Sequence, residues 1–92
     1  MEAVKVPVDF VGAEGYVLIG KDDHPSLKEV VTLARKERTT LKKDGMEMFI
    51  VLFPGHEHCE ALSAQQLEGA LYVNGQKRVR KNRYEKKVKR PF

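Results

Sequence analysis

The stretch MEMFIVLF, residues 46–53, contains a single polar residue, Glu47. A short run that is apolar on both sides of an extended chain is typical of a central strand whose two faces are covered. The sequence therefore predicts that residues 46–53 lie at the centre of a sheet. They are also the best candidates for the hydrophobic core.

The first twenty residues have the pattern of a β-hairpin. Apolar side chains at positions 4, 6, 8 and 10 alternate with their neighbours, which is the period of a half-buried strand. Pro7 has no amide hydrogen to donate, so we expect this strand at an edge of the sheet. Residues 12–15 (GAEG) have turn character, and residues 16–19 (YVLI) form a second run of β-branched and aromatic residues.

Two helices are indicated by their capping signals. Ser26 and Glu29 match a capping box, and apolar residues at helical spacing then predict a helix as far as residues 42–45 (KKDG), where two lysines precede a glycine stop. Ser63 and Gln66 form a second capping box. We expect the second helix to be short and to end near residues 69–71.

Residues 72–79 (YVNGQKRV) place Asn-Gly between two strand-like pieces, a pattern that favours a hairpin with a type I′ turn. The second arm of this hairpin would begin at Lys77. Together the elements predict one α+β domain over residues 1–92. Its small antiparallel or mixed sheet of about four to five strands is expected to pack against one longer and one short helix, in the order β-β-α-β-α-β-β.

Charge is distributed unevenly along the 92 residues, whose net charge is +4. Residues 1–76 contain 8 Lys and Arg against 12 Asp and Glu, which gives −4, whereas residues 77–92 contain 9 against 1, which gives +8. Clustered Lys and Arg release counterions from phosphates. The asymmetry therefore favours nucleic acid or another polyanion as a partner.

The basic segment, residues 77–92 (KRVRKNRYEKKVKRPF), is the strongest functional signal in the sequence. Its cations can neutralise phosphates, and its tyrosine can stack on a base. The predicted binding residues in this segment are Lys77, Arg78, Arg80, Lys81, Arg83, Tyr84, Lys86 and Lys87. The alternative is that the segment only keeps the protein in solution.

The outer face of the first predicted helix is also basic. Lys28, Arg35 and Lys42 recur every seven residues, and Lys28 and Arg35 are candidates to extend the binding surface. The alternative interpretation is that these charges form only the solvated side of an amphipathic helix. A shared surface requires the helix and the basic segment to lie on the same side of the protein.

Residues 56–59 (HEHC) and His24 are the possible metal ligands or nucleophiles. Structural zinc sites draw paired ligands from two separated elements, and the sequence has no second Cys/His pair. The adjacency of Cys59 and His58 does not set the geometry of a nucleophile and its base, and no third orienting group accompanies them. We therefore expect no catalytic residues, no metal site and no cofactor, and predict that the protein is not an enzyme.

The single cysteine, Cys59, excludes an intramolecular disulfide, which fits a reducing cytoplasm. Residues 1–10 (MEAVKVPVDF) lack the features of a signal peptide. No stretch approaches the roughly 20 apolar residues that a membrane span needs. The expectation is a soluble protein without a membrane partner or a small-molecule substrate.

Residues 6–23 (VPVDFVGAEGYVLIGKDD), residues 69–92 (GALYVNGQKRVRKNRYEKKVKRPF) and the overall character of the chain resemble small phage-encoded anti-CRISPR proteins that inhibit the type I-F CRISPR–Cas surveillance complex. This resemblance involves no shared motif, so it assigns no role to any residue. It implies a non-catalytic, stoichiometric inhibitor in the cytoplasm of the bacterial host cell. Such an inhibitor binds the Cas proteins and blocks target DNA binding, and direct contact with guide RNA is left open. The alternative is a small stand-alone nucleic-acid-binding protein or phage regulator.

Overall fold

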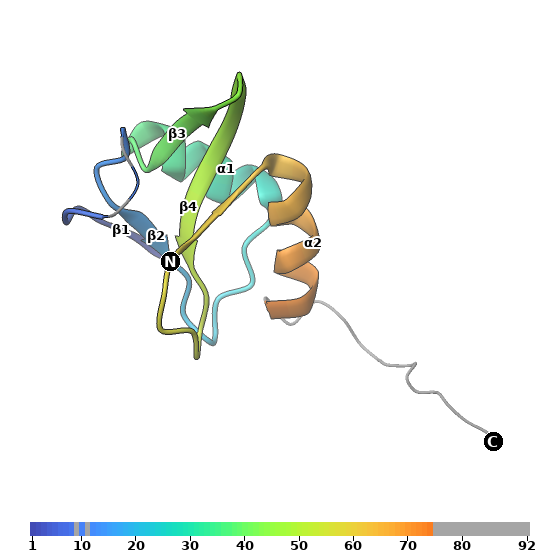
Figure 1. The fold of residues 1–92 in the computed structure, drawn as a ribbon. Helices are drawn as coiled ribbons and strands as arrows, with labels where there is room; N and C mark the ends of the chain where they lie inside the picture. The colour runs from blue at the N-terminus through green and yellow to red at the C-terminus, as the bar shows by residue number, and fades with distance from the viewer. Residues whose placement is uncertain (9, 11, 75–92) are drawn as a thin grey trace.

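The computed structural model describes residues 1–8, 10 and 12–74, and within them two helices pack on one face of a five-stranded mixed sheet (Figure 1). The elements in chain order are β1 (Glu2–Val4), β2 (Tyr16–Leu18), α1 (Leu27–Lys36), β3 (Thr40–Lys43), β4 (Met46–Leu52), β5 (Glu60–Leu62) and α2 (Ala64–Asn74). The predicted α+β fold class is confirmed, and the order of elements agrees with the prediction in outline.

Strand β4 pairs with three other strands and organises the sheet. β2 runs parallel to it, whereas β3 and β5 run antiparallel to it. Phe49 has register partners in both β3 and β5, and Val51 has partners in both β2 and β5. Since a strand residue has one neighbour on each edge, β5 lies on the edge of β4 opposite to β2 and β3. The prediction that residues 46–53 form the central strand is confirmed for Met46–Leu52.

Both faces of β4 are covered. On one face, β2, β4 and the two helices enclose the main core, which consists of Val17, Ile19, Val30, Ala34, Phe49, Val51, Phe53, Leu67 and Leu71. Ile50, which points to the other face by strand alternation, is also fully buried. The described part of the connection between β1 and β2 lies over this second face, where Val8 and Phe10 share a pocket with Leu52.

The first strand is shorter than the sequence alternation predicts. β1 pairs antiparallel with β2, as expected for a hairpin, but it ends at Val4. The apolar residues that follow it cover the second face of the sheet instead of continuing the strand. Gly15 makes the pairing possible because a Cβ at this position would collide with the carbonyl oxygen of Val4.

Helix α1 begins where the capping box predicts. The amide of Ser26 donates to Glu29 Oε1 at 2.8 Å, and the amide of Glu29 donates to Ser26 Oγ at 3.2 Å. These two bonds satisfy amides that a helix start leaves without intrahelical partners. The predicted start of the first helix is confirmed.

The prediction that this helix continues to residues 42–45 is wrong. α1 ends at Lys36, and Thr40–Lys43 forms β3, which pairs with β4. Asp44 and Gly45 have positive φ angles of 53° and 79° and connect the two strands as a two-residue hairpin turn. Asp-Gly is a preferred pair for this turn because both residues tolerate positive φ, so the signal interpreted as a helix stop is a hairpin signal.

Helix α2 also begins at its predicted cap, with hydrogen bonds of 3.0 Å and 3.2 Å between Ser63 and Gln66. It extends to Asn74, so the prediction that residues 72–73 form the first arm of an Asn-Gly hairpin is wrong. The helix continues because Leu67 and Leu71, one turn apart, are both buried in the core. The predicted second arm, from Lys77, lies outside the described residues. Within the described ranges, no helix is long and apolar enough to cross a membrane.

Candidate binding surface

Two of the predicted binding residues, Lys28 and Arg35, lie in the described part of the chain, and both are exposed on α1. The others lie outside the described residues: Lys77, Arg78, Arg80, Lys81, Arg83, Tyr84, Lys86 and Lys87.

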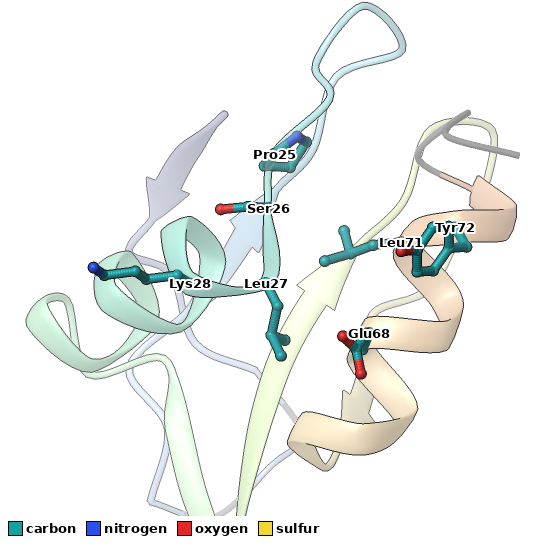
Figure 2. Close-up of a pocket in the computed structure, with 7 residues that line it drawn as sticks. All are labelled: Pro25, Ser26, Leu27, Lys28, Glu68, Leu71 and Tyr72. Carbon is teal, nitrogen blue, oxygen red and sulfur yellow. The ribbon is translucent and has the colours of Figure 1, made fainter.

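A groove of about 420 Å³ lies between the start of α1 and the last turns of α2 (Figure 2). Its lining residues are Pro25, Ser26, Leu27, Lys28, Glu68, Leu71 and Tyr72. The groove therefore brings together the start of α1 and the last turns of α2. Of the two basic residues predicted on the helix face, Lys28 lines this groove. A surface shared with the basic segment stays a prediction, because that segment lies outside the described residues.

The floor of the groove is apolar. Leu71 is 3% exposed and packs in the core, and Leu27 packs against the same cluster. Tyr72, at the rim, is 55% exposed. In Figure 2, Glu68 and Leu71 point from α2 toward α1, whereas Lys28 points away from α2. The groove thus combines an apolar floor, an accessible aromatic ring and one carboxylate.

Arg35 does not contribute to this groove, because its guanidinium is held by Glu47 of β4. Its Nε donates to both carboxylate oxygens at 3.2 Å, and its Nη2 donates to Oε1 at 2.7 Å. The guanidinium carbon lies 6.0 Å from the centroid of the Phe49 ring. The hydrogen bonds from Arg35 lower the pKa of Glu47, although partial burial opposes this shift. Arg35 therefore links α1 to β4, and Lys42, expected on the same helix face, lies in β3.

We expect Arg35→Ala to lower the free energy of unfolding slightly at neutral pH, since solvent screens the partly exposed ion pair. The pKa of Glu47 is lowered in the folded state, so the stabilisation is present above the ordinary carboxyl pKa. It is lost as the pH falls through the lower folded value. Urea unfolding at neutral pH and in strong acid measures this difference.

The matched control for Arg35→Ala is Lys36→Ala, which removes an exposed cation from the neighbouring position of the same helix. We expect this control to change stability by less than about 0.5 kcal/mol. An equal loss of stability in Arg35→Ala at neutral and strongly acidic pH would contradict the assigned role of Glu47.

Residues 56–59, the other candidate from the sequence, divide between two environments. His56 Nδ1 lies 3.1 Å from Glu60 Oε2, and its ring contacts Phe53 edge-on at 6.0 Å between centroids. Glu57, His58 and Cys59 instead line a pocket of about 460 Å³ on the second face of the sheet. No three His, Cys, Asp or Glu side chains within the described ranges are grouped so as to hold a metal ion.

Burial raises the pKa of the Cys59 thiol, which disfavours the thiolate at neutral pH. We expect iodoacetamide to alkylate Cys59 several-fold more slowly than N-acetylcysteine at neutral pH, and urea to remove the difference. Mass spectrometry over time measures both rates. Labelling faster than that of the free thiol would support an activated nucleophile. In a separate test, Cys59→Ser and His58→Ala should each bind the partner like the wild type, which would argue against a nucleophile.

Comparison of the chain with protein-family models, with curated proteins and with solved structures found no match. Sequence reasoning missed the groove because it assigned Tyr72 to a strand. The spacing of four residues between Leu67 and Leu71, following the cap at Ser63, is the signal that could have placed Tyr72 on a helix.

Proposed function

We propose that this protein is a non-catalytic, stoichiometric inhibitor that binds a CRISPR–Cas ribonucleoprotein through its Cas subunits and blocks target DNA binding, with direct contact to the guide RNA left open. The observation that carries the proposal is the separation of charge between residues 1–76, with a net charge of −4, and residues 77–92, with +8. The resemblance of the chain to type I-F anti-CRISPR proteins supports the choice of partner.

Residues 1–76 form the acidic body of the chain. Ion pairs within this body support assigning protein contacts to it and phosphate contacts to the basic segment. Lys5 lies 3.5 Å from Glu14 and 3.7 Å from Glu37, and Arg38 lies 3.6 Å from Glu14. Together with the Arg35 ion pair, these contacts pair three of the eight Lys and Arg side chains of residues 1–76 with carboxylates. An acidic body is suited to the basic DNA-binding surfaces of such an assembly, while the basic segment is suited to phosphates.

The proposed function is tested by pull-down with the tagged protein from a bacterial lysate that contains an active type I-F complex, with and without nuclease treatment. We expect Cas subunits in both samples, and loss of target DNA binding by the complex at one equivalent of the protein. Recovery only without nuclease would indicate bridging by nucleic acid. Absence of Cas subunits from both samples would contradict the proposal.

A stand-alone nucleic-acid-binding protein is the second candidate, and the clustered charge of the basic segment favours it because such a segment attracts any polyanion. Titration of the protein against duplex DNA and RNA at several salt concentrations separates the candidates. Tight binding to generic nucleic acid without any Cas subunit would favour the second candidate, whereas tight binding only to the assembled complex favours the inhibitor.

A further inference from the structure

We propose that Arg38, directly after the end of α1, is a partner-binding residue whose exposed guanidinium pairs with a carboxylate on the surface of the partner protein. This inference rests on the proposed function in taking a Cas subunit as that protein. It assigns a contact residue within the acidic body, where the sequence predicted only Lys28 and Arg35 as binding residues.

The backbone of Arg38 adopts a conformation that glycine usually provides. Its φ angle is 61°, in the left-handed region. Its amide donates to the carbonyl of Arg35 at 3.3 Å, and the amide of Thr39 donates to the carbonyl of Ala34 at 2.9 Å. These two bonds form a Schellman motif at the end of α1, and Arg38 occupies the position in this motif where glycine is most common. A side chain is disfavoured there because its Cβ crowds the following carbonyl oxygen.

Asp44 shows that a positive φ need not indicate a function. Among the described residues it is the other non-glycine residue with a positive φ, 53°. Asp44 lies in the turn between β3 and β4, and aspartate is a preferred residue in such a turn because its short polar side chain tolerates the left-handed conformation. Arginine has no such preference, so local conformation accounts for Asp44 but not for Arg38.

The contacts of the Arg38 side chain within the protein do not account for it either. The side chain is 77% exposed, and its Nη1 lies 3.6 Å from Glu14 Oε2, which is too far for a hydrogen bond. An exposed ion pair of this kind contributes little to stability because water screens it. Arg35 and Lys36 already place positive charge in the last turn of α1, near the negative end of the helix dipole. The fold therefore accepts strain at Arg38 and gains little in return, which is a mark of a functional residue.

The charges around Arg38 favour a protein over a nucleic-acid strand. Glu14 also lies 3.5 Å from Lys5, which lies 3.7 Å from Glu37. The four side chains thus form a row in which positive and negative charges alternate. A nucleic-acid strand carries a phosphate at every nucleotide, so the phosphates beside a bound one would be repelled by Glu14 and Glu37. A protein surface can place one carboxylate against the guanidinium fork and its cations against the two glutamates.

The test compares Arg38→Gly with the wild type in three measurements on the full chain. Urea unfolding should show that the ratio of folded to unfolded protein rises about two- to fivefold, because glycine removes the backbone strain. Titration against the purified type I-F complex should show an affinity about tenfold lower, because the ion pair with the partner is lost. The affinity for free single-stranded RNA of about 12 nucleotides should stay unchanged.

Three control variants separate strain from charge. Lys36→Ala removes a neighbouring exposed cation, and Asp44→Gly introduces glycine at the other positive φ. Neither should lower the affinity for the complex. Arg38→Lys keeps the charge but not the planar fork, so it should retain part of the affinity and show no gain in stability.

Three results would overturn the role of Arg38 while leaving the proposed function intact. They are a stability of Arg38→Gly at or below that of the wild type, an unchanged affinity of this variant for the complex, and a loss of RNA affinity as large as the loss for the complex. The last result would assign Arg38 to a phosphate. Failure of the wild type itself to bind the complex would instead contradict the proposed function, and with it the protein partner inferred for Arg38.

Discussion

Replacement of Ile50 by aspartate is expected to unfold the protein. Ile50 is fully buried in β4, where its amide donates to the carbonyl of Thr39 at 3.0 Å and its register partner is Ala61 of β5. An aspartate side chain there would be buried away from water, and burial of an unpaired charge costs several kcal/mol. This cost is comparable with the whole free energy of unfolding of a small domain, about 5 kcal/mol.

The measurement is circular dichroism during thermal and urea unfolding. Met46→Asp provides a matched control, because it makes a similar change in the same strand at a side chain that is 55% exposed. Its register partner is Lys43, so the new carboxylate meets a cation, and we expect a change within about 0.5 kcal/mol. A cooperative transition of Ile50→Asp at the wild-type midpoint would contradict the burial of the second sheet face.

The core of the fold was predictable because its signals are local and agree with one another. Residues 46–53 are apolar on both faces except at Glu47, and Met46–Leu52 form β4, in which residues 49–51 are buried. The two capping boxes, at Ser26 and Ser63, place both helix starts correctly. A cap is a short-range interaction within one turn, so sequence alone is sufficient to locate it.

Helix ends were less predictable, because they depend on what the following residues contact. The chain between Lys36 and Gly45 has a helix-compatible pattern, but the Thr39–Thr40 pair is β-branched and pairs with β4 instead. At the second helix, burial of Leu71 in the core outweighs the turn preference of the Asn-Gly pair. Tertiary contacts thus end α1 earlier than predicted and extend α2 beyond its predicted end.

The candidate site was predictable only in its charge. Sequence composition identifies the basic segment. The groove, in contrast, lies between α1 and α2, and its residues Leu27 and Tyr72 are more than forty positions apart in the chain. The same limit applies to Arg35, whose periodicity suggested a solvent-facing cation. Its partner Glu47 lies on a strand that the helix approaches only in the folded protein.

Replacement of Arg78, Arg80, Lys81 and Arg83 by alanine is expected to weaken binding to the ribonucleoprotein or to single-stranded RNA by on the order of 100-fold at physiological salt. Each neutralised phosphate of a single strand contributes a slope of about −0.7 in the dependence of log affinity on log salt. Loss of four contacts should therefore reduce the magnitude of the slope by about 3. Fluorescence anisotropy at several salt concentrations measures both quantities.

The control for this variant replaces Arg78, Arg80 and Arg83 by lysine, which retains every charge. If counterion release dominates, the lysine variant keeps the wild-type slope, whereas a slope as low as that of the alanine variant would indicate specific guanidinium contacts. Among the described residues, the core side chains belong to residues 17–71, and we expect both variants to unfold like the wild type. If the alanine variant kept the affinity and the salt slope of the wild type, the basic segment would serve only to keep the protein in solution. Binding would then have to come from the acidic body.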